Sequence, residues 1–479
     1  MSAPRRLSPA TLAGRDVPVS PALDRRPDVG IVHFGIGAFH RAHQAAYTAD
    51  ALEAAPGPWG ICGVAPRRPE SVDQLAPQDG LYSHLERGAD GDRLRVYAPV
   101  REVLAGFESP ARVVARLADP AVHVVSLTIT ERGYPRDGEL AADLGGHPPR
   151  TALGQLVRGL QARAAGGEAG PVTVLCCDNL PRNGAMLAGL VEDACARLPA
   201  AEGGPAGEWI AAHVRFPDTV VDRIVPAATP ADRADAARVL GLDDRAVVVS
   251  EPFREWVIED AFAGPRPAWE RAGARLVPDA APFEALKLRF LNGTHCALAY
   301  LGLPAGARTV HEAVARPDLA VVARRLIDED LAPTLTPAAG LEPAAYASAM
   351  FERFGNGRIA HRLAQIAMDG SRKLPQRLLA PARDRLDAGA EPRWIALVTA
   401  AWGEHLRGGD DVHDELAGPA RAALDRAGGP AARARALLAL DGVFGAELAG
   451  SARFRDLVTD WLERLEADGI ERTLRAAAA

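Results

Sequence analysis

The first 280 residues alternate short, continuously apolar runs with segments of helical hydrophobic periodicity. Runs of this kind, rich in Val and Ile and bounded by turn residues, are typical of strands buried on both faces of a parallel sheet. Alternation of strand and helix predicts an α/β fold with right-handed crossovers. We predict strands at 29–34, 60–64, 122–129, 172–177 and 246–250, and helices near 38–54, 109–118, 151–164, 184–197 and 230–240.

After about residue 280 the strand signals stop, and Gly and Pro punctuate a series of helical patterns. The change predicts a second, mostly α-helical domain. We place the boundary in the loop-like region 275–282, which gives domains 1–278 and 279–479. The predicted helices lie near 281–303, 308–332, 342–354, 358–368, 376–387, 392–407, 414–426, 431–441 and 452–467.

Composition narrows the class of protein. The chain is 48% hydrophobic and 24% charged, which is typical of a globular protein, and its formal net charge is −7. That charge argues against a nucleic-acid surface or a basic membrane patch. We find no run of about 18 apolar residues that could span a bilayer. We therefore expect a small-molecule partner, no nucleic acid, no membrane, and a monomer or weak homo-oligomer.

The expected compartment is the cytoplasm. The N-terminal residues carry arginines but no apolar segment, so we do not expect a secretory signal; a transit peptide is the alternative, although Asp16 and Asp24 interrupt it. The five cysteines are odd in number and form no CxxC pair. A disulfide framework and a zinc site are therefore both unexpected, and a reducing compartment fits.

Two residue types are rare in this chain. Among 55 Lys and Arg residues only Lys287 and Lys373 are lysines, and the only asparagines are Asn179, Asn183, Asn292 and Asn356. Abundant Ala, Gly, Pro and Arg indicate GC-rich coding DNA, which disfavours Lys and Asn codons. A surface Lys can become Arg at little cost, but a Lys that must lose its proton cannot. The rare residues are therefore candidates for chemistry.

A glycine turn follows the first predicted strand, in the run IVHFGIGAFHRAHQ. Gly35 and Gly37 would let a pyrophosphate approach the backbone, and the next helix would offer free N–H groups. His40 stands where the third glycine of the usual fingerprint would be. The pattern alone leaves two interpretations open, a nucleotide site and a plain turn.

The end of the second predicted strand bears on cofactor choice. Glu70 could bind the ribose hydroxyls and repel a 2′-phosphate, whereas Arg67 or Arg68 could bind that phosphate. The spacing from Gly35 exceeds the usual ~20 residues. We expect NAD, with NADP less favoured.

The stretch 282–295, PFEALKLRFLNGTH, places Lys287, Asn292 and His295 on one side of a predicted helix. Hydride leaves a carbinol carbon as its hydroxyl proton is taken, and a lysine removed from water can take it. An amide and an imidazole can hold the alkoxide. Glu284 could carry the proton to solvent or form an i,i+3 ion pair with Lys287. The structural alternative is a snorkelling Lys, a capping Asn and a buried His.

Two further segments hold the remaining rare residues. Residues 178–184, DNLPRNG, follow a predicted strand, where ligands of α/β sheets bind; a simple turn is the alternative. Residues 369–377, DGSRKLPQR, are predicted as a loop between helices with a cationic rim.

Together these segments resemble the mannitol dehydrogenase family of polyol-specific long-chain dehydrogenases. The resemblance covers about residues 30–380, in the motifs GIGAFHRAHQ, SLTITERGY, CCDNLPRNG, FPDTVVDRIVP, SEPFREWVIED, LKLRFLNGTHCALAYLG and QIAMDGSRKLPQR.

The resemblance implies an N-terminal Rossmann-type domain, a helical C-terminal domain, a site between them, and NAD(P) dependence without metal. It implies that Lys287 is the base, that Asn292 and His295 hold the alkoxide, and that Glu284 lies on a proton channel. It places substrate contacts at Asn183, Asp222 and Lys373. The residues expected to contact the cofactor are Gly35, Ile36, Gly37, Ala38, Phe39, Arg67, Glu70, Thr128, Thr130, Asp178 and Asn179.

The pattern at the substrate end resembles the hexuronate branch of the family, which interconverts D-mannonate and D-fructuronate. Polyol enzymes of the family tend to carry Arg where this chain has Gln365. A hexuronate has a carboxylate, for which a guanidinium is the expected anchor, and Arg377 and Arg254 are the candidates. A mannitol, arabinitol or sorbitol 2-dehydrogenase and a catalytically silent nucleotide-binding homologue are the alternatives.

Overall fold

The computed structural model describes residues 4–20, 22–130, 133–134, 137–145, 147–167, 169–409 and 412–479. Two residues of the motif SLTITERGY, at positions 131 and 132, lie outside this set. The chain divides into two compact units, Met1–Ala281 and Pro282–Ala479. The division falls in the region 275–282, where the helical pattern of the sequence takes over.

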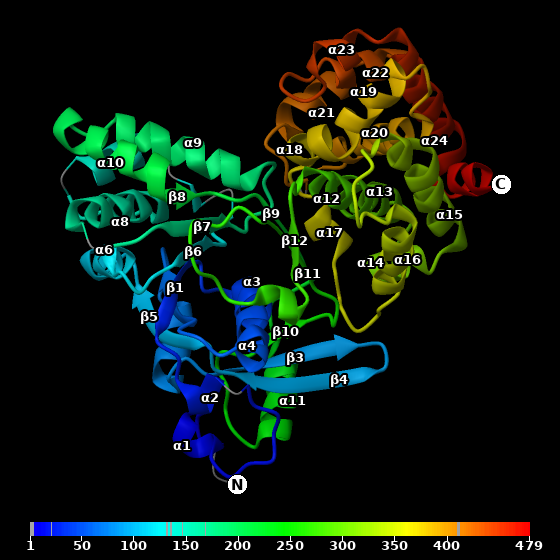
Figure 1. Ribbon diagram of the computed structural model, residues 1–479. Helices are drawn as coiled ribbons and strands as arrows, with labels where there is room; N and C mark the ends of the chain where they lie inside the picture. The colour runs from blue at the N-terminus through cyan, green and yellow to red at the C-terminus, as the bar shows by residue number, and fades with distance from the viewer. Residues whose placement is uncertain are drawn as a thin grey trace. The chain divides into compact units, whose positions relative to one another are not determined.

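A six-stranded parallel sheet forms the centre of the N-terminal unit (Figure 1). Its strand order is β5-β2-β1-β6-β7-β8, so the winding reverses between β1 and β6. Such a reversal leaves a crevice at the carboxyl ends of the strands, where ligands of open α/β sheets bind. The strands are β1 (Val29–Phe34), β2 (Gly60–Ala65), β5 (Val100–Ala105), β6 (Val124–Leu127), β7 (Val172–Cys176) and β8 (Val214–Arg215).

Both faces of this sheet are buried. Ile31 belongs to a core cluster with residues of α4, whereas its neighbour Val32 belongs to a cluster with residues of α6, α8 and α9. Because successive strand side chains point to opposite faces, a strand covered on both sides must be continuously apolar. The helices are α1 (Pro9–Leu12), α2 (Ala22–Arg25), α3 (Ala38–Ala42), α4 (Gln44–Ala54), α5 (Glu70–Leu75), η1 (Ala76–Gln78), α6 (Pro110–Ala118), α7 (Asp137–Leu144), α8 (Ala152–Gly166), α9 (Asn183–Ala196), α10 (Ala200–His213), α11 (Pro230–Leu240) and η3 (Trp269–Ala272).

Two smaller sheets complete the N-terminal unit. One has the order β10-β3-β4, with β3 (Tyr82–Gly88), β4 (Gly91–Tyr97) and β10 (Val248–Ser250). The other has the order β12-β11-β9, with β9 (Thr219–Asp222), β11 (Glu255–Glu259) and β12 (Arg275–Val277). The predicted strand 246–250 therefore forms, but it pairs with β3 instead of joining the main sheet. Its apolar pattern reflects burial in the core, which a strand of either sheet can satisfy.

The C-terminal unit is helical, as predicted, and is built around one large apolar core. Its helices are α12 (Ala281–Leu286), α13 (Gly293–Gly302), α14 (Val310–Val314), α15 (Pro317–Arg325), η6 (Ala332–Thr334), α16 (Pro343–Phe354), α17 (Leu363–Ile366), α18 (Gly370–Leu374), α19 (Ala380–Asp387), α20 (Arg393–Leu406), α21 (Ala417–Arg426), α22 (Pro430–Leu438), α23 (Gly445–Gly450) and α24 (Ala452–Ala478). Three segments are π-helical: η4 (Lys287–Asn292), η5 (Leu326–Leu331) and η7 (Pro375–Leu379).

The prediction of a loop at 369–377 is wrong. After Asp369, which adopts a left-handed φ of 54°, the chain enters α18 and continues into η7. Ser371 and Leu374 are buried, whereas Arg372 points outward to pair with Glu415. The exposed Arg372 and the buried Ser371 and Leu374 therefore lie on different faces of a short helix.

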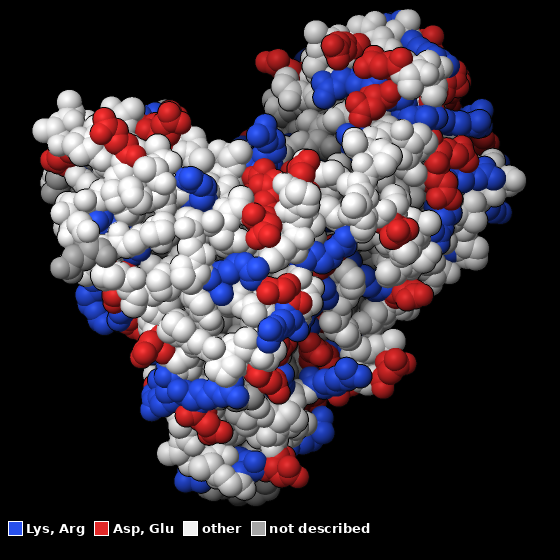
Figure 2. Space-filling model, viewed as in Figure 1, with Lys and Arg blue, Asp and Glu red and all other residues white. Residues whose placement is uncertain are grey.

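On the face that Figure 2 shows, Lys and Arg side chains lie among Asp and Glu side chains. No helix in the part of the chain that the structure describes combines the length and hydropathy that a membrane crossing requires.

Candidate functional site

The glycine turn after β1 is a cradle of bare backbone. Gly35 has a φ of 96°, and a Cβ there would lie 2.1 Å from the carbonyl oxygen of Thr128. A Cβ on Gly37 would meet only the Gly35 carbonyl oxygen at 3.8 Å, so the space in front of it is open. α3 begins at Ala38, and the first N–H groups of a helix have no partner within it. The residues present therefore fit a dinucleotide pyrophosphate.

A buried pair of histidines supports this turn where a third glycine would otherwise be. The rings of His33 and His40 stack with centroids 3.4 Å apart. The Oγ1 of Thr128 lies 2.9 Å from His33 Nε2 and donates to the Gly35 carbonyl at 3.0 Å. Burial lowers the pKa of His33 to about 3, so the pair stays uncharged at neutral pH. Thr128 thus stabilises the backbone conformation of the glycine turn.

A pocket of about 250 Å³ lies at the carboxyl ends of β2, β5 and β6, and its walls include Pro66, Arg67, Phe107 and Ile129. This is the end of the sheet where the adenosine half of a dinucleotide binds. Arg67 is one of the residues that line this pocket. Glu70 is exposed at the start of α5.

The segment after β7 is held by its own polar side chains. The Oδ1 of Asp178 accepts from the backbone of Thr130 at 2.7 Å, and its Oδ2 accepts from the hydroxyl of Tyr134 at 2.9 Å. Thr130 has a left-handed φ of 61°, which this contact stabilises. Asn179 is exposed.

Asn183 is buried and saturated with protein partners. Its Nδ2 donates to the carbonyls of Asp178 and Thr219, both at 3.0 Å, and its Oδ1 accepts from the Thr219 amide at 2.9 Å. These bonds join the start of α9 to β9, the strand that ends at buried Asp222. The geometry of Asn183 favours a structural role over substrate contact.

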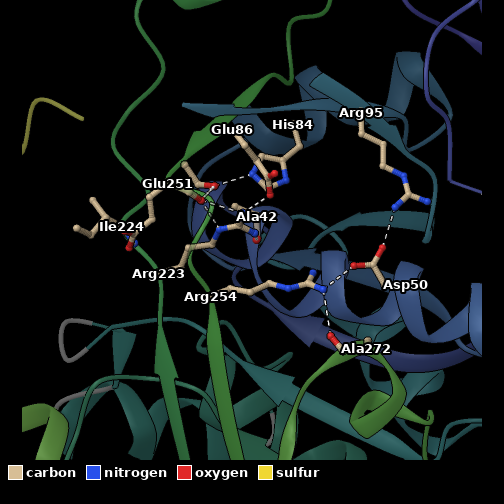
Figure 3. A network of polar contacts seen from close by, with 11 residues as sticks. Ala42, Asp50, His84, Glu86, Arg95, Arg223, Ile224, Glu251, Arg254 and Ala272 are labelled. Atoms are coloured by element: carbon tan, nitrogen blue, oxygen red, sulfur yellow. Dashed lines mark hydrogen bonds and ion pairs between the residues drawn. The ribbon is translucent and has the colours of Figure 1, made fainter. Parts of the chain in front are cut away.

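Two arginines near β9 belong to a network of polar contacts (Figure 3). Arg223 is completely buried, pairs with Glu86, and donates to the carbonyls of Ala42 and Glu251 at 2.5 and 3.0 Å. It thereby ties the end of α3, and with it the glycine turn, to the strands.

Arg254 in the same network already has protein partners. Its guanidinium lies 2.7 Å from the carboxylate of Asp50 and donates to the Ala272 carbonyl at 3.1 Å (Figure 3). It also stacks 4.2 Å from the ring centre of Tyr47. A guanidinium with these partners is poorly placed to give them up for a ligand. Of the two arginines proposed from the sequence as a carboxylate anchor, Arg254 has surroundings typical of a residue that stabilises the fold.

In the C-terminal unit, Lys287, Asn292 and His295 lie on one continuous helical stretch formed by α12, η4 and α13. Lys287 begins the π-helical segment η4 and Asn292 ends it. The i→i+5 bonds of a π-helix widen the turn, so residues five apart come closer to one side than in an α-helix. All three side chains are buried, with exposed fractions of 7–8%.

Asn292 and His295 make no side-chain hydrogen bond with the residues that the structure describes. The Nδ2 of Asn292 and the Nε2 of His295 are buried without a partner. A buried unpaired polar group costs about 1–3 kcal/mol, and a bound ligand that completes its hydrogen bonds removes that cost. Burial lowers the pKa of His295 well below 6.5, and nearby His361, Arg377, Arg353 and Lys287 lower it further. His295 is therefore a neutral imidazole.

Arg377 lies on η7, which packs against η4. Gly293 allows this approach, because a Cβ there would be 3.1 Å from Leu378 and 3.3 Å from the Arg377 carbonyl oxygen. Among the described residues the Arg377 guanidinium has no carboxylate partner; its one hydrogen bond is from Nη1 to the Cys296 thiol at 3.7 Å. Arg377 is a half-buried cation next to His295.

The remaining candidates are more peripheral. Lys373 donates from Nζ to the carbonyls of Met368 and Ile366, at 2.5 and 3.4 Å. Gln365 is exposed on α17. Glu284 is half-buried on α12, three residues before Lys287.

Sequence reasoning missed His361, whose ring lies edge-on to His295 with centroids 4.9 Å apart. The chain has 12 histidines, so rarity gives no signal, and the contact joins residues 66 positions apart in sequence. It also missed Arg223, one of many arginines. Within the described residues there is no group of three or more His, Cys, Asp or Glu placed to hold a metal ion.

Comparison with known proteins agrees with this architecture. Residues 29–271 match the mannitol dehydrogenase Rossmann domain, and residues 279–466 match the mannitol dehydrogenase C-terminal domain. The chain is 38% identical to the D-mannonate oxidoreductase of Escherichia coli (strain K12), over 97% of this chain and 99% of that protein. It is 36% identical to a mannitol 2-dehydrogenase of Pyrenophora tritici-repentis, over 92% of this chain and 80% of that protein.

Solved structures give the same result. The mannitol 2-dehydrogenase of Pseudomonas fluorescens, determined with NAD and D-mannitol, superposes with a TM-score of 0.86 at 34% identity, covering 98% of this chain and 99% of that one. A D-sorbitol dehydrogenase superposes with a TM-score of 0.87 at 29% identity, covering 98% and 100%. The chain belongs to the mannitol dehydrogenase family and is an oxidoreductase acting on CH–OH groups.

Proposed function

We propose that this protein is an NAD-dependent oxidoreductase that interconverts D-mannonate and D-fructuronate. The observation that carries the proposal is the guanidinium of Arg377, which has no carboxylate partner among the described residues. It lies beside Asn292 and His295, whose buried Nδ2 and Nε2 have no hydrogen-bond partner there either. The relative that is a D-mannonate oxidoreductase supports the same substrate, and five free cysteines fit the reducing cytoplasm.

The chemistry divides among four side chains. Lys287 takes the hydroxyl proton when the alcohol is oxidised and returns it when the ketone is reduced. Asn292 donates from Nδ2 to the substrate oxygen as it becomes an alkoxide, and neutral His295 donates from a ring nitrogen. The bound nicotinamide supplies or accepts the hydride. Glu284 relays the proton to solvent.

Arg377 selects the substrate by charge. A hexuronate carries a carboxylate where a polyol or ketose carries a neutral hydroxymethyl group. A guanidinium binds a carboxylate with two parallel, charge-assisted hydrogen bonds. Asp222 and Lys373 contact the hydroxyl groups of the substrate. At the position of Gln365, polyol enzymes of the family tend to carry an arginine, which this chain lacks.

The rival is a mannitol-type 2-dehydrogenase, which the likeness to the mannitol 2-dehydrogenase structure favours. Steady-state kinetics with NADH against fructuronate, tagaturonate and fructose separates the two. We expect fructuronate to give the highest kcat/KM. Comparable turnover of fructose would overturn the hexuronate proposal in favour of the polyol reading.

We propose NAD over NADP because Glu70 would repel a 2′-phosphate, although Arg67 lines the neighbouring pocket. Glu70→Ser should tighten NADPH binding and leave NADH binding nearly unchanged, as measured by cofactor fluorescence. Glu139→Gln, which removes the carboxylate that lines that pocket, is the matched control. A wild-type protein that already binds NADPH more tightly would show that Arg67 and Arg68 decide.

A further inference from the structure

His295 has no hydrogen bond to fix its ring among the described residues, so packing must set its orientation. Two aromatic rings provide that packing. Phe354, the last residue of α16, lies 4.8 Å from the His295 centroid at an interplanar angle of 31°. The ring centroid of His361 lies 4.9 Å from that of His295, at an interplanar angle of 84°. The rings of Phe354 and His361 therefore pack against the imidazole at different angles.

Backbone hydrogen bonds fix the position of His361. Its amide donates to the Ile359 carbonyl at 2.9 Å, and its carbonyl accepts from the Val310 amide at 3.0 Å. The next residue, Arg362, forms a β-bridge with Thr309, and Leu363 donates to the Arg308 carbonyl at 2.9 Å. The segment around His361 is therefore clamped to the start of α14.

The ring of His361 makes no hydrogen bond to the described residues, and its Nδ1 is buried without a partner. Burial lowers the pKa of His361, and nearby Arg353 lowers it further, so this imidazole is also neutral at neutral pH. Among the described residues, the aromatic contact of this ring is with His295.

We propose that His361 is a positioning residue for His295: its ring, together with Phe354, fixes the imidazole in the orientation that holds the substrate oxygen. This rests on the proposed function, in which His295 stabilises the alkoxide. A misplacement of about 1 Å of a catalytic group can cost on the order of 10²-fold in rate.

The test compares His361→Ala with His361→Phe. Removing the ring should lower kcat for ketone reduction by about 10²-fold, because His295 loses its fixed orientation. KM and the Kd of NADH, measured by fluorescence, should change little. The phenyl ring of His361→Phe restores the contact without nitrogens, and we expect its kcat within about threefold of wild type. Should the Ala variant fail to fold, His361→Leu provides the same loss of a planar ring.

His311→Ala is the matched control, because His311 lies beside Val310 on α14 and its Nδ1 lies 2.8 Å from the Gly355 carbonyl oxygen. This variant should keep the kcat of wild type. Such a result would show that removing the contact between α14 and Gly355 does not by itself slow the reaction. A double-mutant cycle completes the test: in a His295→Ala background, loss of His361 should have no further effect.

Three results would overturn the positioning role: full kcat in His361→Ala, a His361→Phe variant as slow as His361→Ala, or additive losses in the cycle. An active His295→Ala variant would instead refute the role of His295 in the proposed function, so the two failures are distinguishable.

Discussion

The candidate residues of the two units differ in how far protein partners occupy their polar side chains. In the N-terminal unit, Asn183 uses both ends of its amide on protein partners, and Arg254 is shared among a carboxylate, a carbonyl and an aromatic ring. In the C-terminal unit, Asn292 has no partner among the described residues, and Arg377 has only a thiol. The residue types are the same; only their surroundings differ.

This difference in hydrogen bonding predicts which substitutions lower stability and which lower activity. A saturated buried group contributes to folding, and its loss leaves partners unpaired. An unsaturated one costs stability, and it persists where a ligand completes its bonds. Asn183 and Arg254 should therefore act on stability, and Asn292 and Arg377 on activity.

The largest expected effect belongs to Lys287. Lys287→Ala should lower kcat by about 10²–10⁴, the range for loss of a general base, while NADH binding is retained. Lys287→Arg should fail almost as badly, because a guanidinium does not give up its proton. Stopped-flow or steady-state reduction of fructuronate measures both, and near-normal turnover in either variant would refute the assignment of the base.

The two asparagines offer the sharpest contrast. Asn292→Ala should lower kcat and kcat/KM together by about 10²–10³, as loss of an oxyanion donor does, with little change in Tm. Asn183→Ala should instead destabilise the fold by about 1–3 kcal/mol, because it strands the buried groups of Asp178 and Thr219. Activity per folded molecule, measured beside thermal unfolding, separates them. An Asn183→Ala variant that is stable but inactive would break the comparison.

The smallest effect concerns Asp330, a buried and fully used carboxylate on η5. Its Oδ2 accepts from the amides of Trp394 and Ile395 at 2.7 and 2.8 Å, which caps α20. Burial raises the pKa of Asp330 to about 7 from 3.8. The folded state therefore holds this proton longer than the unfolded state, and its contribution to stability is lost as pH rises from about 4 to 7.

Asp330→Asn keeps an accepting oxygen and does not titrate, so its Tm should change less than that of wild type across this pH window. Differential scanning calorimetry at several pH values measures the slope. An identical slope in the two proteins would show that Asp330 does not titrate in this window.

Sequence alone predicted much of the fold, for reasons visible in particular elements. β1, β2, β6 and β7 were predictable because strands buried on both faces must be continuously apolar. The β3–β4 hairpin was missed because Glu86, Arg93 and Arg95 interrupt its pattern. The helix α18 was missed because Gly370 and Ser371 begin it and Pro375 follows it, and these residue types are typical of turns.

The candidate site was predictable where rarity marked it, at Lys287 and Asn292. The sequence does not show whether a polar side chain already has hydrogen-bond or ion-pair partners within the protein. The saturation of Asn183 depends on Thr219, 36 residues away, and the engagement of Arg254 depends on Asp50 and Tyr47 in a helix far along the chain. Partners of this kind are set by the tertiary fold.

The central claim is that Arg377, and not Arg254, binds a substrate carboxylate. The most direct test is the ratio of kcat/KM for fructuronate to that for fructose in wild type, Arg377→Met and Arg254→Met. Losing one partner of a buried charge-assisted contact costs about 2–5 kcal/mol, so Arg377→Met should lower the ratio by roughly 30-fold or more, through fructuronate alone. Arg254→Met should leave the ratio nearly unchanged and lower Tm slightly. An unchanged ratio in Arg377→Met, or a collapsed ratio in Arg254→Met, would contradict the account.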